Sequence, residues 1–269
     1  MARNRFGTMR AAAAALVAWA AWSAGLDGAH AEVAAADPVD VAMRQCLAQR
    51  DRSSTAGQIQ CMGEAQQQWQ TVMDAAYKRL LNDAPDDAKR GWQESQRRWL
   101  TWRKDEALLL KAVYDTTRGT MYTMASADTQ LQPVRDRALA LRAAADRYAA
   151  PAGGPGGATP KAADNGASNA AAAGPANTPK NDARDPSRRI RPCEQDAACE
   201  HALFDLNRYY QKLRHKMPAH SAATLVHAQR AWVAYRDATA PLVGEDGRID
   251  LIGARIATMK RLSETAGNN

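Results

Sequence analysis

The chain has 269 residues, a formal net charge of +7 and a sequence pI near 9.4. Its length allows one large domain or two small ones. The positive excess lies outside the segments with a helical pattern, because residues 32–149 carry 17 basic and 16 acidic side chains and residues 192–269 carry ten and nine. A nucleic-acid-binding domain needs a basic surface on its folded part, so this charge distribution excludes nucleic acid as the partner.

Residues 1–31 are predicted to be a signal peptide. They begin with the basic stretch MARNRFGTMR, continue with an apolar core at residues 11–24 and end in Ala-His-Ala. This order is typical of a secretory leader that is cleaved after Ala31. No cysteine follows the apolar core and no later stretch reaches the roughly 18 apolar residues of a membrane span. We therefore expect a periplasmic or secreted protein with no membrane anchor after cleavage.

The next segment, residues 38–148, has the periodicity of three helices. Apolar residues spaced by three and four mark one face of each of the first two helices. The first face is Cys61, Ala65, Trp69, Met73, Tyr77 and Leu80, and the second is Trp92, Trp99, Trp102, Leu110 and Val113. Asp86 or Asp87 is expected to cap the second helix, and Gly119 interrupts the pattern after it. A third helix is predicted over residues 128–148, with Pro133 near its first turns.

Residues 149–190 are rich in Ala, Gly, Pro and Asn and contain almost no large apolar side chain. Such a composition cannot bury a core, which predicts a disordered linker. A flexible linker of this length separates two small domains without fixing the angle between them.

The last segment, residues 191–266, repeats the pattern of the first. Ala202, Leu206, Tyr210 and Leu213 correspond to the first helical face, Ala228, Trp232 and Tyr235 to the second, and residues 246–262 supply the third helix. The first two faces keep a constant offset of 133 positions, which indicates an internal duplication. Few runs alternate between apolar and polar residues. The predicted fold is therefore all-α, with two small three-helix domains.

Each repeat also contains one cysteine pair. In an exported chain, an even number of cysteines favours disulfides, which we expect between Cys46 and Cys61 and between Cys193 and Cys199. The alternative for the second pair is a metal site with His201, but the C-x2-C spacing and a fourth ligand are missing. We therefore predict no metal and no cofactor.

The duplication is most evident in two octapeptides, Gln96–Arg103 (QRRWLTWR) and Gln229–Arg236 (QRAWVAYR). On a helix, positions i, i+3 and i+7 share one face. One interpretation is packing, with Trp99 and Trp232 buried and the Gln and Arg residues holding a neighbouring helix. The other is recognition, because Trp, Tyr and Arg often dominate binding energy at interfaces. Both interpretations concern the same candidate residues, which are Gln96, Trp99, Trp102, Arg103, Gln229, Trp232, Tyr235 and Arg236.

Motifs of catalysis are missing from the sequence. It contains no HExxH, no G-x-S-x-G and no phosphate-binding glycine loop on a strand–helix turn. The histidines that follow the leader all lie in the second repeat and have no counterpart in the first. We therefore predict that the protein is not an enzyme.

The cysteine pair, the helix with Tyr77 and Leu80, and the following Ser95–Trp99, Trp102 and Arg103 together resemble the LprI-like lysozyme inhibitor family of exported bacterial proteins. The second repeat carries the same pattern. The resemblance implies two tandem domains and non-covalent binding to a lysozyme-type muramidase. A second hypothesis is a non-enzymatic adaptor of the cell envelope, with another envelope protein as its partner. The near-neutral charge of both repeats favours the adaptor, since acidic surfaces would steer association with a basic lysozyme.

Overall fold

The structure, a computed structural model, describes residues 36–149 (the first half) and 190–268 (the second half). Within these two ranges it contains six α-helices, three short 3-10 turns and no β-strand, which confirms the all-α prediction. The expected signal peptide and nearly all of the expected linker lie outside the described residues. None of the described helices is long and apolar enough to cross a membrane.

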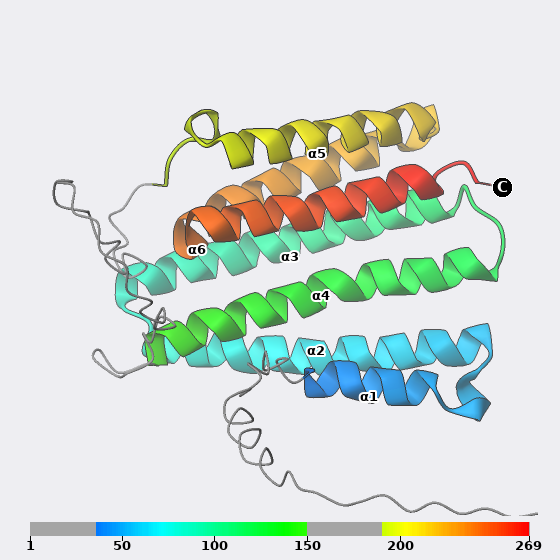
Figure 1. Cartoon of the computed structure of the whole chain (residues 1–269), viewed down its shortest axis with the longest axis horizontal. Coiled ribbons are helices and arrows are strands. Elements are labelled where there is room, and N and C mark those ends of the chain that lie inside the picture. Colours follow the sequence, from blue (N-terminus) through cyan, green and yellow to red (C-terminus); the bar gives the residue numbers. More distant parts are fainter. Residues whose placement is uncertain (1–35, 150–189, 269) are drawn as a thin grey trace, which may run out of the picture. The chain divides into compact units, whose positions relative to one another are not determined.

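The first half contains a short helix followed by three long ones. These are α1 (Pro38–Leu47), α2 (Thr55–Asp83), α3 (Asp86–Tyr114) and α4 (Thr120–Ala149), with the 3-10 turn η1 (Arg50–Arg52) after α1. Helices α2 and α4 lie side by side, and α1 packs along α2 (Figure 1). Gly119 adopts a φ of 108°, a conformation that favours glycine, at the turn between α3 and α4.

The second half contains the counterparts of the three long helices, but the last two are joined into one broken helix. They are α5 (Ala197–Lys216) and the two parts of α6 (Ala222–Thr265), with η2 (Cys193–Gln195) and η3 (Ala219–Ser221) before α5 and α6. Helix α6 is broken at Gly244, where φ is 81° and ψ is −173°. The chain turns back at this residue, so the second part of α6 (residues 245–265) runs beside the first (residues 222–243) (Figure 1).

The predicted helical faces form the core. Trp69, Met73, Leu80, Trp92 and Leu213 are each fully buried, because they lie on the faces that the helices turn toward one another. On those faces only Tyr77, Ala202 and Tyr210 remain half-buried.

Helix boundaries differ from the prediction at three places. Helix α1 was not predicted, and α4 begins at Thr120, so Pro133 lies in its interior. Residues 120–127 are mostly small or polar and lack the apolar spacing that marks a helix. Asp86 does not cap α3 but is its first residue, after Pro85 at the N-cap position.

Long-range ion pairs hold α1 in place. Arg135 on α4 donates to both carboxylate oxygens of Asp40, and Arg142 donates to Asp37 at 2.6 Å. The hydrogen bond from Arg135 lowers the pKa of Asp40 below its ordinary value. These partners are about a hundred positions away in the sequence, so local periodicity could not reveal them.

Both expected disulfides are present. Cys46–Cys61 joins α1 to α2 with a Cα–Cα distance of 5.7 Å, and Cys193–Cys199 joins η2 to α5 with a Cα–Cα distance of 5.1 Å. Each bond closes a short loop before the first long helix of its half.

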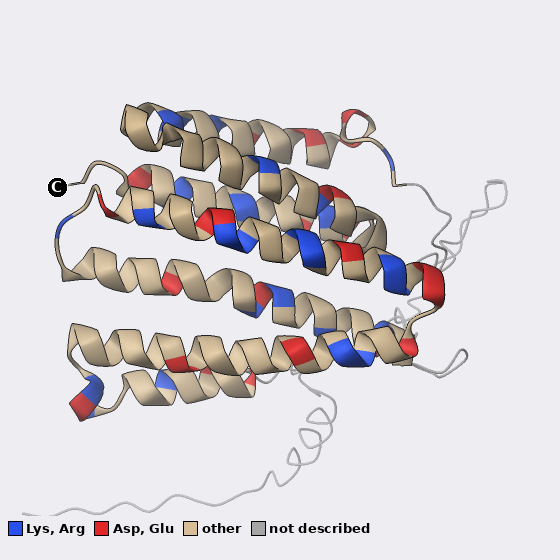
Figure 2. Ribbon diagram, turned by 180° about the vertical axis from the view of Figure 1, so that it is seen from behind, with Lys and Arg blue, Asp and Glu red and all other residues tan. Residues whose placement is uncertain are grey.

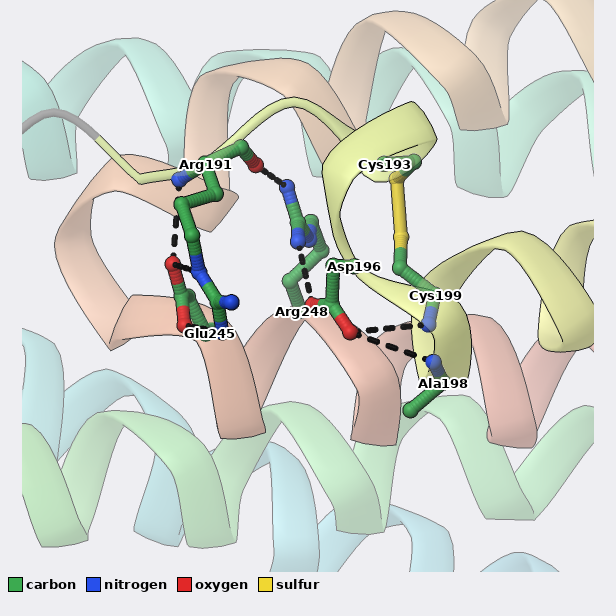
Figure 3. Close-up of polar contacts among 7 residues, drawn as sticks. All are labelled: Arg191, Cys193, Asp196, Ala198, Cys199, Glu245 and Arg248. Atoms are coloured by element: carbon green, nitrogen blue, oxygen red, sulfur yellow. Dashed lines mark hydrogen bonds and ion pairs between the residues drawn. A yellow bond between two sulfur atoms is a disulfide. The ribbon is translucent and has the colours of Figure 1, made fainter.

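A polar cluster fixes the loop closed by the second disulfide (Figure 3). Asp196 caps α5 by accepting from the backbone of Ala198 and Cys199, and it also accepts from Arg248 at 2.8 Å. Arg248 donates further to the carbonyl oxygen of Arg191, whose side chain pairs with Glu245. Hydrogen bonds from Arg191 lower the pKa of Glu245 to about 2. The cluster therefore ties the chain entering α5 to the residues that follow the break at Gly244.

The two halves pack against each other mainly through α3 and α6 (Figure 1). The described helices of both halves consequently belong to one compact unit. The linker composition predicted no fixed angle between the halves, whereas the contacts of α3 with α6 hold the described helices together. The linker length could not reveal it, since the packing depends on side chains of α3 and α6 rather than on the connection.

Candidate functional site

The two octapeptides lie opposite each other where α3 meets α6. The rings of Trp102 and Tyr235 stack with centroids 5.5 Å apart and an interplanar angle of 1°. Beside this stack, Ser95 Oγ on α3 lies 2.7 Å from Thr239 Oγ1 on α6. Further along, a Cβ placed on Gly91 would lie 2.7 Å from Leu242 Cδ2. Because residue numbers fall on α3 as they rise on α6, the two helices are antiparallel.

This pairing has approximate two-fold symmetry. Trp102 and Tyr235 are equivalent positions of the duplication, 133 residues apart, and they contact each other. Equivalent residues meet in this way only at a two-fold axis. The repeats therefore associate within one chain as the subunits of a symmetric dimer do between chains.

Two buried arginines extend the aromatic stack on both sides. Arg137 on α4 lies over the ring of Tyr235, with its Cζ 5.5 Å from the centroid. Arg255 on the second part of α6 lies over the ring of Trp102 at 5.8 Å. The order Arg137, Tyr235, Trp102, Arg255 thus places one cation at each end of two stacked rings and combines cation–π and aromatic attraction.

The same two arginines bind the glutamines that begin the octapeptides. Arg137 Nε donates to Gln96 Oε1 at 2.9 Å, and Arg255 Nε donates to Gln229 Oε1 at 3.1 Å. Arg255 also pairs with Glu106 Oε1 at 2.7 Å, and both side chains are almost completely buried. Glu106 in turn accepts from Trp102 Nε1. In both halves the glutamine that begins the octapeptide therefore accepts a hydrogen bond from an arginine of the third long helix.

The octapeptide arginines differ between the two halves. Arg103 donates to the carbonyl oxygen of Gln130 on α4 and lies over the ring of Trp99, and burial lowers its pKa. Arg236 lies over the ring of Trp232 and, within the described ranges, pairs with its exposed neighbour Asp237. Of these two arginines, Arg103 is therefore the one that is hydrogen-bonded to another helix.

Replacing Arg103 by Ala is expected to reduce the free energy of unfolding by about 2 kcal/mol, because a charged hydrogen bond to a backbone carbonyl is lost. Replacing Arg236 by Ala is expected to cost less than about 1 kcal/mol, since its ion pair is open to solvent. Urea denaturation of both variants, with Arg97→Ala as an exposed control, measures the difference. Equal stability of all three variants would contradict a packing role for Arg103.

Other groups that could carry chemistry are dispersed. Acidic and basic residues are interspersed along the helices (Figure 2). In the described ranges there is no group of three or more His, Cys, Asp or Glu side chains that could hold a metal. His201 is exposed and lies 3.8 Å from Asp205. A shallow depression of about 310 Å³ lies between α2 and α4 and is lined by uncharged residues, among them Gly63, Gln66 and Gln130.

Sequence reasoning missed the buried charges at this junction: Glu106, Arg137 and Arg255. A signal for the arginines existed, because Arg137 and Arg255 occupy equivalent places in the third helix of each half. Each is followed four residues later by a buried apolar residue, Leu141 or Met259. The third helices keep an offset of 118 rather than 133, which hides the correspondence.

Comparison with known proteins matches the chain to one family model and to solved structures. The family model described as lysozyme inhibitor LprI matches residues 46–141 and 190–265. A crystal structure of an uncharacterized protein from Burkholderia thailandensis is 63% identical, with a TM-score of 0.73. That match covers 87% of this chain and 100% of the other. No curated protein matches the sequence.

Proposed function

Because this chain belongs to the LprI lysozyme inhibitor family, we propose that it is an exported protein that binds a lysozyme-type muramidase non-covalently and inhibits it. The observation that carries the proposal is the family match, which extends over both halves. Export fits this role, since an inhibitor that protects the cell wall must meet its target outside the cytoplasm. We propose that the leader is cleaved after Ala31 and that the mature protein acts in the periplasm or after secretion.

The junction of the octapeptides supports a scaffold role rather than direct contact with the target. Trp99, Trp102, Trp232 and Tyr235 are each less than one tenth exposed, so they have little surface to offer a partner. The inhibitory contact therefore belongs to exposed side chains that the scaffold positions. Candidates are the large apolar residues on the surface, notably Leu108 on α3 and Phe204 on α5, which are 59% and 67% exposed.

Titration of the mature full-length chain into a lysozyme assay on bacterial cell walls tests this function. We expect hydrolysis to fall with increasing inhibitor until the enzyme is saturated. Leu108→Asp and Phe204→Asp are matched variants on different helices, and neither is expected to change stability by more than about 0.5 kcal/mol. Loss of inhibition in one variant alone identifies the contacting face. Unchanged hydrolysis at a large molar excess of the wild-type chain would refute the proposal.

The alternative is an envelope adaptor that binds another protein through the same exposed apolar residues. The halves share a buried ion pair and an aromatic stack, so partner capture has to use the intact chain rather than separated halves. Capture of an envelope protein that Phe204→Asp or Leu108→Asp abolishes, together with no effect on lysozyme, would favour the adaptor.

A further inference from the structure

The two buried arginines of the junction differ in their charge balance. Arg137 and Arg255 are 1% and 2% exposed, and each donates through Nε to the glutamine of its own octapeptide. Arg255 is neutralised by Glu106. Arg137 has only neutral partners among the described residues, namely Gln96 and Ser95 Oγ, which accepts from Nη2 at 3.0 Å. A buried charge without a counter-charge is costly.

The duplication explains the difference residue by residue. Thr239 stands 133 positions after Glu106, so the second half has a hydroxyl where the first has the carboxylate. Thr239 Oγ1 lies 2.7 Å from Ser95 Oγ, the group that accepts from Arg137. The equivalent of Ser95 beside Arg255 is Ala228. Arg255 is therefore paired with Glu106, whereas Arg137 is hydrogen-bonded to Ser95, which in turn contacts Thr239.

Unpaired donors surround Arg137. Its Nη1 and the Nε1 of Trp92 are both buried and have no hydrogen-bond acceptor among the described residues. The two side chains are neighbours, because the Cζ of Arg137 lies over the Trp92 ring at 5.7 Å from its centroid. Leu225, which has no donor, occupies the position equivalent to Trp92. Arg255 also leaves one nitrogen, Nη2, unpaired, but its charge is balanced.

We propose that Arg137 and Trp92 bind a small monovalent anion of the size of chloride at the junction of the two halves. The anion supplies the negative charge that Glu106 supplies to Arg255, and it accepts hydrogen bonds from Arg137 Nη1 and Trp92 Nε1. A water molecule satisfies donors but leaves the charge unbalanced. A polyatomic anion is disfavoured because aromatic rings, Trp92 and Tyr235, lie against the guanidinium. This site is independent of the proposed function.

Thermal unfolding of the full-length mature protein in sodium chloride and in sodium gluconate at equal ionic strength tests the site. An anion that binds only the folded state stabilises it, so we expect the melting temperature in chloride to be higher by at least about 2 °C. Equal melting temperatures in the two salts would overturn the proposal.

A double variant, Ser95→Ala with Thr239→Glu, installs beside Arg137 the residues found beside Arg255. We expect it to lose the chloride-specific shift and to melt in gluconate at least as high as the wild type melts in chloride. Thr101→Glu makes the same change at an exposed position of α3 and should keep the full shift. A double variant that folds and retains the shift would count against the site.

Diffraction from crystals of the wild-type protein grown in sodium bromide gives a second readout that needs no variant. Bromide replaces chloride and scatters anomalously, so we expect an anomalous peak next to Arg137 Nη1 and Trp92 Nε1. Density for water alone, without an anomalous peak, would overturn the proposal even if chloride raised the melting temperature by a general salt effect.

Discussion

Replacing Glu106 by Ala is expected to lower the free energy of unfolding by about 3–5 kcal/mol. The carboxylate is 1% exposed, and it pairs with Arg255 of the other half at 2.7 Å. Its removal leaves a guanidinium buried without a counter-charge, and it also removes the acceptor of Trp102 Nε1. Urea denaturation followed by circular dichroism measures the loss.

Two further variants separate the ion pair from a general effect of the substitution. Glu64→Ala makes the same change on the exposed side of α2 and should cost less than about 1 kcal/mol. Glu106→Leu combined with Arg255→Met removes both charges and should recover most of the stability, since apolar residues often replace a buried ion pair without loss. A double variant as unstable as Glu106→Ala would show that the buried charge is not the cause.

Replacing Trp102 by Ala is expected to cost about 3–5 kcal/mol as well, because a buried indole is lost where the two halves meet. Tyr235→Ala is expected to be destabilising for the same reason. The stability lost by the double variant should be smaller than the sum of the two single losses by about 1 kcal/mol. This difference is the interaction energy typical of a stacked aromatic pair.

Phe204→Ala is the matched control, since it truncates an aromatic side chain that is 67% exposed, and it should change stability by less than about 0.5 kcal/mol. The Trp102 and Tyr235 variants should still unfold in a single transition if the halves are one cooperative unit. Strictly additive losses, or two separate transitions in the wild-type chain, would contradict the junction as described.

The helical faces and the disulfides could be predicted because both depend on local information. A spacing of three and four residues places Trp69, Met73 and Leu80 on one side of any helix, whatever that helix packs against. Two cysteines fifteen positions apart already lie close together when the segment between them turns. Helix α1 was not predicted, although Asp37 at its N-cap and Pro38 in its first turn are local signals of a helix start.

The candidate site was predicted only in part. The repeated octapeptides were identified as important, and their burial follows from Trp99 and Trp232 on helical faces. Their mutual contact, however, could not be read from spacing. An apolar helical face predicts that the face is buried, but it does not predict which helix packs against it. The pairing of α3 with α6 is therefore known only from the contacts in the structure.

The sequence by itself determined the helical class, the duplication, the cysteine pairs and the residues that had to be buried. Only the tertiary structure decided that the repeats join around Trp102 and Tyr235. It also decided that Glu106 neutralises Arg255, whereas the equivalent Arg137 is hydrogen-bonded to neutral side chains among the described residues. The reason is physical. Helix formation and loop closure are governed by residues near in the chain, whereas pairing of buried charges and rings depends on residues well over a hundred positions apart.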